Sequence, residues 1–228
     1  MNASPGKIET ALFAVGFTMA GVMLLVVLWS GRGAYEDMAR ANGVEQTTLL
    51  AHVPGGGTYT TDRNGLVAIH ERWSTYVTGG ATDAPRFQPA LFTEDEYSHM
   101  ADVRRVFDGA KILIPAGLFV MAIRLQRARS KSAATMFRLV RDGAIAAGAL
   151  VAVVGVVAAV AFDAAFLLFH QVFFPQGNFL FDPATSNLLR LYPDWYWQGI
   201  TFRIGLSFIG LAAAAGAAAA VGLRRALH

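Results

Sequence analysis

The chain has 228 residues, of which 54% are hydrophobic and 15% charged, and its formal net charge is +3 at pH 7. A soluble domain carries about 25% charged residues, so this composition predicts an integral membrane protein. The sequence contains no cysteine, which excludes thiol nucleophiles, disulfides and cysteine-ligated metal centres. Nor does it show the combination of basic and aromatic residues that is typical of a nucleic-acid-binding surface.

Four apolar stretches are each long enough to cross a hydrocarbon core of about 30 Å as a helix, which takes about 20 residues. They are residues 11–29, 106–125, 144–169 and 199–223. The first is long for the apolar part of a signal peptide, so we expect it to remain as a helix. The sequence therefore predicts an all-α membrane protein with four transmembrane helices, folded as a single membrane domain over residues 1–228.

Lysine and arginine mark the cytoplasmic side of short loops in membrane proteins. The link between the second and third stretches is rich in arginine, and the C-terminal tail carries Arg224 and Arg225. The link between the third and fourth stretches holds only Arg190. We therefore expect both termini to be cytoplasmic. Residues 30–98, between the first and second helices, would then form a small extracytoplasmic subdomain.

The pattern within this subdomain predicts a mixture of helix and short strands. Residues 47–53 have strand character, and the triple glycine at 55–57 predicts a sharp break. Apolar residues recur at helical spacing over 66–77, and Asp62 is placed to cap that helix. The alternative is a hairpin turn at Asn64-Gly65.

Two further patterns concern the long helices. Thr93 and Glu96 have the spacing of a capping box, so a helix should begin there and continue unbroken into the second transmembrane stretch. The alanine-rich run 212–220 predicts a helix face that packs closely against a neighbour. The glycines that would take part in this packing are Gly205, Gly210, Gly216 and Gly222.

Two histidines are the main candidates for chemistry. His99 precedes the second apolar stretch and His170 follows the third, so the predicted topology places both at one face of the membrane. Imidazole has the side-chain pKa nearest neutral pH and suits acid–base catalysis. Asp102 shares a helix face with His99 and would fix the tautomer of its ring. Either histidine alone is typical of a surface or a helix end, and the pair is what predicts a reaction site.

Polar residues interleave with phenylalanines in the segment 169–183, which contains five phenylalanines, one before His170 and four after it. Gln176, Asn178 and Asp182 lie in this run, and side-chain amides suit the stabilisation of a developing oxyanion. The alternative is a structural aromatic belt at the membrane interface, which is also how we interpret residues 195–197. We expect these three residues, with Asp102, to support or orient the histidines or to stabilise an oxyanion.

Three charged residues lie within or near the apolar stretches. Asp108 and Lys111 fall on the second and Asp163 on the third, and charges in such places are costly and often functional. Asp108 and Lys111 have the spacing of a pair. Asp163 lies two helical turns before His170 and would orient it through water or pair with Lys111. These residues are a candidate intramembrane charge network.

Two segments also carry a resemblance to a known family. Residues 92–107 include His99-Met100-Ala101-Asp102-Val103 and resemble the His-Met-x-Asp-Val block of the bacterial lipoprotein intramolecular transacylases. Residues 169–183 and Leu191-Tyr192-Pro193 resemble the second block of that family, which has four transmembrane helices. Residues 35–90 show no comparable similarity.

The resemblance implies a definite reaction. Enzymes of this family move the sn-2 acyl chain of a diacylglyceryl-cysteine lipoprotein to its N-terminal α-amine, which gives the lyso-form lipoprotein. The family's catalytic histidines would correspond to His99 and His170, with no cofactor and no metal. The partners would be the lipoprotein and membrane lipids, not nucleic acid, and the site would lie on the extracytoplasmic face of the bacterial cell membrane.

Other functions remain open from the sequence. A membrane lipid or lipoprotein hydrolase would use the same histidines, either without metal or with Asp102 or Asp182 as a third metal ligand. A haem-binding membrane protein would use the two histidines as axial ligands. A transporter built on the three charged residues is less favoured, because the four helices show no inverted repeat.

Overall fold

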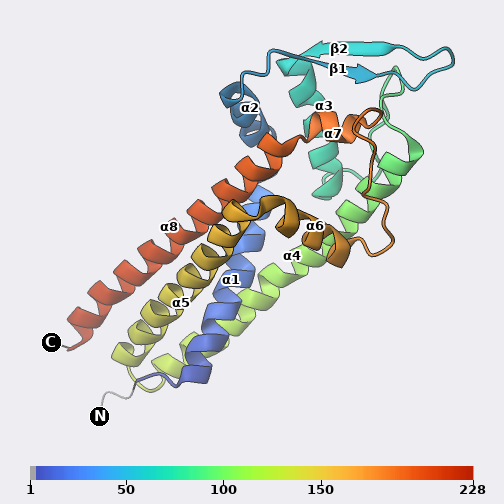
Figure 1. Ribbon diagram of the computed structural model, residues 1–228. Helices are drawn as coiled ribbons and strands as arrows, with labels where there is room; N and C mark the ends of the chain where they lie inside the picture. Colours follow the sequence, from blue (N-terminus) through green and yellow to red (C-terminus); the bar gives the residue numbers. More distant parts are fainter. Residues whose placement is uncertain (1–3, 228) are drawn as a thin grey trace. The chain divides into compact units, whose positions relative to one another are not determined.

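The computed structural model describes residues 4–227 and consists mainly of helices (Figure 1). The chain divides into two compact units. One, here called the helix unit, comprises residues up to 26, residues 110–160 and residues from 202 onward. The other, the mixed unit, comprises Val27–Gly109 and Ala161–Thr201.

Within residues 4–227, four helices are long and apolar enough to cross a membrane, which confirms the prediction of four such elements. They are α1 (Lys7–Trp29), α4 (Glu94–Arg129), α5 (Ala133–Val160) and α8 (Asp194–Leu227). Figure 1 shows all four as extended helices. The expected bounds of the third were wrong, because the stretch that we predicted as one helix over 144–169 is interrupted after Val160.

The interruption separates α5 from α6 (Phe162–Phe173). Ala161, between them, has φ −133° and ψ 50°, which lies outside the helical region of backbone space. His170 therefore belongs to a separate 12-residue helix. An apolar run shows no sign of such a break, because every residue around it is a tolerable helix former.

Small residues allow the helices of the helix unit to approach closely. A Cβ atom added to Gly117 of α4 would lie 2.5 Å from the Gly16 carbonyl oxygen of α1, and one added to Gly16 would lie 2.8 Å from the Gly117 carbonyl oxygen. Phe208 of α8 is fully buried against Ala14 and Ala147. These contacts bury apolar side chains at short interhelical distances.

The glycines that we expected to pack closely in α8 mostly do not. A Cβ atom added to Gly205, Gly210 or Gly216 would meet nothing within 4 Å. Among these four glycines, an added Cβ atom would meet a neighbour only at Gly222, where it would contact the Phe137 ring. The predicted packed face of the run 212–220 is confirmed by Ala212 and Ala219, each 4% exposed, and Gly216 is also buried. The expected contribution of Gly205 and Gly210 was wrong, because composition does not reveal which face of a helix meets a neighbour.

The mixed unit contains a two-stranded antiparallel hairpin. Strands β1 (Gln46–Leu50) and β2 (Thr58–Asp62) pair with Gln46 opposite Asp62 and Leu50 opposite Thr58. Gly55, Gly56 and Gly57 turn the chain between them with φ of +89°, +70° and +138°, backbone angles that favour glycine. The expected strand and break are confirmed.

Helix α3 (Arg63–Val77) follows the hairpin directly. The Asp62 side chain accepts a hydrogen bond from the Gly65 backbone amide at 2.8 Å, so the predicted cap is confirmed and the alternative hairpin turn at Asn64-Gly65 is wrong. Trp73 is fully buried in the core of the unit. Helix α2 (Arg32–Ala41) completes this part, with Tyr35 also fully buried.

The capping box at the start of α4 is confirmed and has a second role. Thr93 N donates to Glu96 Oε2 at 2.9 Å, and Glu96 N donates to Thr93 Oγ1 at 3.2 Å. The other oxygen of Glu96 accepts hydrogen bonds from Ser186 Oγ and Leu188 N at 2.7 and 2.8 Å. The carboxylate of Glu96, which is 1% exposed, therefore ties the short helix α7 (Asn187–Leu191) to α4.

Asn187 ties α7 to the hairpin as well. Its Oδ1 accepts from Leu50 N at 2.9 Å, and its Nδ2 donates to the carbonyl oxygens of Leu50, at 2.8 Å, and Leu91. Asn187 is fully buried, so these bonds replace those that water would make. Helix α7 is thereby fixed between β1 and the start of α4.

Candidate active site

The structure brings His99 and His170 together. Their ring centroids lie 6.2 Å apart and the ring planes differ by 18°. His99 lies in the second turn of α4, which the capping box at Thr93 and Glu96 positions. His170 lies in the last turn of α6. Both side chains belong to the mixed unit and both residues are buried, at 8% and 7% exposure.

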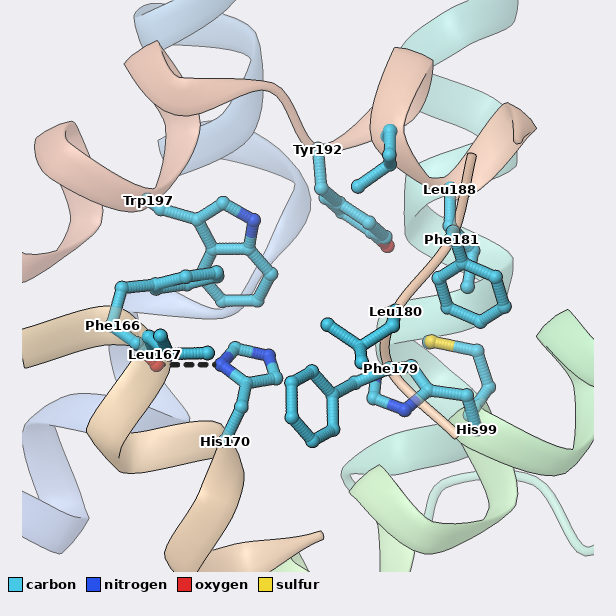
Figure 2. Close-up of a pocket in the computed structure, with 12 residues that line it drawn as sticks. His99, Phe166, Leu167, His170, Phe179, Leu180, Phe181, Leu188, Tyr192 and Trp197 are labelled. Carbon is cyan, nitrogen blue, oxygen red and sulfur yellow. Dashed lines mark hydrogen bonds between the residues drawn. The ribbon is translucent and has the colours of Figure 1, made fainter. Parts of the chain in front are cut away.

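The two histidines border one cavity of about 200 Å³ (Figure 2). It is lined by His99, Met100, Phe166, Leu167, His170, Phe179, Leu180, Phe181, Leu188, Leu189, Tyr192 and Trp197. Most of these side chains are apolar, so the imidazoles face a space of low polarity. Leu180 is 76% exposed, so an apolar side chain lies at the edge of the cavity.

His170 has one ring nitrogen already engaged. Its Nδ1 lies 2.8 Å from the Phe166 carbonyl oxygen, and because a carbonyl only accepts, Nδ1 carries the proton and donates. Nε2 is then an unprotonated acceptor. Burial lowers the pKa of His170 from its usual value near 6.5, and the bond to Phe166 opposes part of that change. The ring is therefore neutral at pH 7 with a basic nitrogen available.

His99 is held mainly by aromatic rings. The rings of Phe174 and Phe181 have their centroids 4.8 and 5.5 Å from that of His99. Its Nδ1 is buried and makes no hydrogen bond within residues 4–227. A proton on Nδ1 would be left unpaired in a dry environment, which is costly, so the favoured tautomer carries it on Nε2.

Asp102 does not hydrogen-bond to His99. Its Oδ2 accepts hydrogen bonds from Gln176 Nε2 and Asn178 Nδ2, each at 2.6 Å, and its Oδ1 pairs with Arg105. The carboxylate thus joins α4 to the segment that follows α6. Gln176 and Asn178, for which an oxyanion role was one expectation, donate hydrogen bonds from their amide nitrogens to Asp102. Neither residue lines the cavity.

The remaining predicted residues lie away from the cavity. Asp182 Oδ1 accepts from Ala184 N at 2.9 Å and so shapes the turn before α7. Asp108 forms an ion pair with Arg104 at 3.8 Å, and Asp163 is exposed in the first turn of α6. Asp182, Asp108, Asp163 and Lys111 are all absent from the cavity lining.

Sequence reasoning missed Tyr192 and Trp197, both of which line the cavity. Aromatic residues next to a transmembrane stretch are typical of an interfacial belt, so their type gave no signal. The only signal was that Tyr192 falls in a segment that resembles the family's second block. Across residues 4–227, no group of three or more histidine, aspartate or glutamate side chains is arranged as a set of metal ligands.

Comparison with known proteins decides the family. The model of the family described as lipoprotein intramolecular transacylase Lit matches residues 10–197. The chain belongs to the Lit family. The matched range includes every residue that lines the cavity, and the Lit transacylases are acyltransferases of the membrane. No curated protein sequence matches the chain.

Solved structures show the Lit fold independently. The chain is similar to the membrane-integral lipoprotein intramolecular transacylase Lit from Bacillus cereus, with a TM-score of 0.74, 13% sequence identity and 96% of each chain covered. Two structures of that enzyme with one histidine replaced, by arginine and by alanine, each give a TM-score of 0.71 at 13% identity. They cover 96% of this chain and 92% and 94% of their own. At this identity the similarity shows the shared fold.

Proposed function

We propose that this chain is a lipoprotein intramolecular transacylase that moves the sn-2 acyl chain of a diacylglyceryl-cysteine lipoprotein to the α-amine of the same cysteine. The product is an N-acyl, S-monoacylglyceryl lipoprotein. The observation that carries the proposal is that His99 and His170, from different helices, border one apolar cavity. Family membership supports the same reaction.

His170 is the general base in this proposal. Its Nδ1 proton is engaged by the Phe166 carbonyl, so Nε2 is the nitrogen that can accept a proton from the substrate. The α-amine has a pKa of about 7.7–8.0 and gains nucleophilicity by losing a proton. A neutral imidazole beside it provides the acceptor at the moment when the new N–C bond forms.

His99 is the complementary donor. With its proton on Nε2, the ring donates a hydrogen bond to the ester carbonyl oxygen as negative charge develops there. His99 thus has the oxyanion role that was one of two expectations for Gln176, Asn178 and Asp182. Asp102, Gln176 and Asn178 instead support the site by holding the segment after α6 against α4.

The reaction then balances within one substrate molecule. The amine nitrogen attacks the ester carbonyl carbon, and one N–H proton passes to His170 Nε2. Collapse of the tetrahedral intermediate breaks the bond between the carbonyl carbon and the glyceryl oxygen. The proton on His170 Nε2 passes to that oxygen, so the enzyme ends as it began. Because amine and ester belong to one molecule, holding them in register supplies much of the acceleration.

The apolar lining favours transacylation over hydrolysis. A cavity walled by phenylalanine and leucine side chains such as Phe179, Leu180 and Phe181 offers few polar groups that would hold a water beside the ester. The exposed apolar surface of Leu180 at its edge suits the acyl chains of a lipid substrate. The substrate is thus a lipid-modified polypeptide in the membrane.

The bias of arginine and lysine in the loops supports a multi-pass protein of the bacterial cell membrane with both termini cytoplasmic. In that orientation the histidines lie at the extracytoplasmic face. Residues 30–98 form an extracytoplasmic subdomain between α1 and the transmembrane part of α4.

The test is mass spectrometry of N-terminal lipopeptides from a reporter lipoprotein. The chain is expressed in bacteria that make only the diacyl form, beside His99→Ala and His170→Ala at equal membrane levels. Wild type should produce a species of equal mass whose fragments place one acyl group on nitrogen, and both variants should not. His52→Gln, a histidine that does not line the cavity, is the matched control and should retain activity.

Two outcomes would contradict the proposal. A lipopeptide that loses the mass of one acyl chain would identify a hydrolase. An unchanged lipopeptide in cells that contain folded wild-type protein would show that the chain does not act on this substrate.

A further inference from the structure

One side chain of the cavity is connected to a buried histidine that lies outside the lining. Tyr192 lines the cavity, and its Oη lies 3.3 Å from Nδ1 of His70 in α3. Nε2 of His70 lies 3.2 Å from the carbonyl oxygen of Ser30. The proposed reaction uses neither Tyr192 nor His70, although both are polar groups held in a fixed arrangement.

The direction of these hydrogen bonds follows from the carbonyl group. Because the Ser30 oxygen only accepts, the proton of His70 lies on Nε2. Nδ1 is then an acceptor, and the Tyr192 hydroxyl must donate its proton to it. The oxygen of Tyr192 is left with lone pairs only, so toward the cavity it is an acceptor and not a donor.

His70 is well fixed in this state. It is 2% exposed and its ring stacks on Tyr35 at a centroid distance of 4.2 Å and an angle of 11°. Burial lowers the pKa of His70 to about 4, and burial raises the pKa of Tyr192 well above its usual value. At neutral pH the imidazole is uncharged and the phenol protonated, so Tyr192 remains the hydrogen-bond donor and His70 Nδ1 the acceptor.

We propose that Tyr192 Oη accepts an N–H hydrogen bond from the substrate α-amine. His70 is a positioning residue, because its Nδ1 accepts the hydrogen bond that the Tyr192 hydroxyl donates. The attacking amine has one lone pair and two N–H bonds. One N–H faces His170 Nε2 and the other faces Tyr192 Oη, which leaves the lone pair directed at the ester carbonyl carbon. No covalent bond to Tyr192 forms or breaks.

The position of Tyr192 agrees with this role. Figure 2 shows its ring between Trp197 and the leucines of the lining, with the hydroxyl oxygen directed toward the middle of the drawn side chains. The cavity offers few acceptors, since most of its lining is phenylalanine and leucine. A primary amine entering this space loses hydrogen bonds to water, and Tyr192 replaces one of them.

The inference rests on the proposed function, and a Tyr192→Phe variant tests it. The purified full-length protein in proteoliposomes receives a synthetic diacylglyceryl lipopeptide, and the N-acyl product and the deacylated product are measured together. We expect kcat for N-acyl transfer to fall about tenfold, the effect of one hydrogen bond. The share of deacylated product should rise, because water then competes with a poorly oriented amine.

Tyr196→Phe is the matched control. The Tyr196 ring lies 5.0 Å from that of Tyr192, but Tyr196 does not line the cavity. Removing its hydroxyl should leave rate and product ratio unchanged. His70→Phe retains an aromatic ring against Tyr35 but frees the Tyr192 proton, so it should behave like Tyr192→Phe. His70→Gln offers one donor and one acceptor and should restore most of the rate.

The outcomes separate this inference from the proposed function. Wild type without N-acyl product would refute the proposed function itself. Active wild type with an unchanged rate in Tyr192→Phe would overturn the inference. A lower rate with an unchanged product ratio, in protein normalised to its folded fraction, would also overturn it, because that result marks a merely structural residue.

Discussion

Asn178 Nδ2 donates a hydrogen bond of 2.6 Å to Asp102 Oδ2, across two segments that are distant in the sequence. The same oxygen accepts from Gln176 at 2.6 Å. One carboxylate on α4 thus holds the segment that leads from His170 to the phenylalanines of the cavity. The carboxylate fixes the cavity wall and not the tautomer of His99.

Replacement of Asp102 by alanine should therefore loosen the segment over residues 174–183. Hydrogen bonds to a charged acceptor contribute about 1.5–3 kcal/mol each, so we expect about a tenfold fall in transacylation. Amide hydrogen exchange over 174–183 should become faster. The contribution of Arg105 should be small, because its side chain is 78% exposed.

Asp163→Ala is the control for this variant, since Asp163 is exposed on α6 and does not line the cavity. It should leave both exchange and activity as in wild type. Full activity in Asp102→Ala, with unchanged exchange, would show that the segment is held by its aromatic contacts alone.

The sequence predicted those features of the fold and the site that depend on local patterns. Length and hydropathy were sufficient for four spanning helices, and the capping box at Thr93 and Glu96 gave the start of α4. The prediction that His99 and His170 come together rested on the ends of the second and third apolar stretches, although His170 lies in the separate helix α6. These features depend on local sequence, so periodicity and capping chemistry reveal them.

The parts that the sequence did not predict depend on distant partners. Asp102 is three residues from His99, yet Gln176 and Asn178, which donate hydrogen bonds to it, lie after α6. Tyr192 directly follows α7, but its hydrogen-bonding partner His70 lies 122 residues earlier in the chain. No proline or glycine adjoins the helix break at Ala161, so local sequence does not indicate it. Tertiary contacts decide each of these.

Close packing of α1 against α4 makes a prediction about stability. Gly117→Ala adds a Cβ atom 2.5 Å from the Gly16 carbonyl oxygen and 2.9 Å from Ala20 N. Neither backbone atom can move without displacing α1, so we expect a loss of about 1–3 kcal/mol. Thermal unfolding of the detergent-purified protein, followed by fluorescence, measures the change.

Gly210→Ala is the matched substitution on α8, where the new Cβ would meet nothing within 4 Å. Here the higher helix propensity of alanine should be neutral or stabilise the protein by up to about 1 kcal/mol. Equal melting temperatures for the two variants would mean that α1 and α4 do not approach each other as closely as the glycines allow.

The state of His170 makes a prediction about the pH dependence of the reaction. Its neutral form is the base, and burial lowers its pKa below the usual 6.5. The substrate amine, with a pKa of about 7.7–8.0, must also lose its proton. Between pH 6.5 and about 7.5 the rate should rise about tenfold per unit through the amine alone.

A steeper dependence, from both groups, should begin only below pH 6.5. Single-turnover rates with a short lipopeptide at saturating enzyme give the profile without product release. If the steeper dependence, which reflects deprotonation of both groups, already begins above pH 6.5, then His170 is charged near neutral pH and is not the base.

His70 makes a prediction about the pH dependence of stability. In the unfolded chain its pKa is near 6.5, and burial lowers the pKa of the folded state to about 4. Between these values the unfolded state binds more protons, so stability is fully present above pH 6.5 and is lost as pH falls toward 4. A shift of this size corresponds to about 3 kcal/mol at pH 4 and about 2 kcal/mol at pH 5.

The groups around His70 do not produce this effect themselves. Tyr35, Tyr192 and Tyr196 are phenols, which keep their protons throughout this range. The nearby carboxylate of Glu71 pairs with Arg32 at 2.8 Å on the surface.

Comparison with His70→Gln, which cannot titrate, isolates the contribution of His70 from that of all carboxylates. Between pH 7.5 and pH 5 wild type should lose about 2 kcal/mol more than this variant. Parallel losses in the two proteins would mean that His70 becomes protonated in the folded state near its ordinary pKa, and that the Tyr192 hydroxyl is then no longer held by a neutral ring.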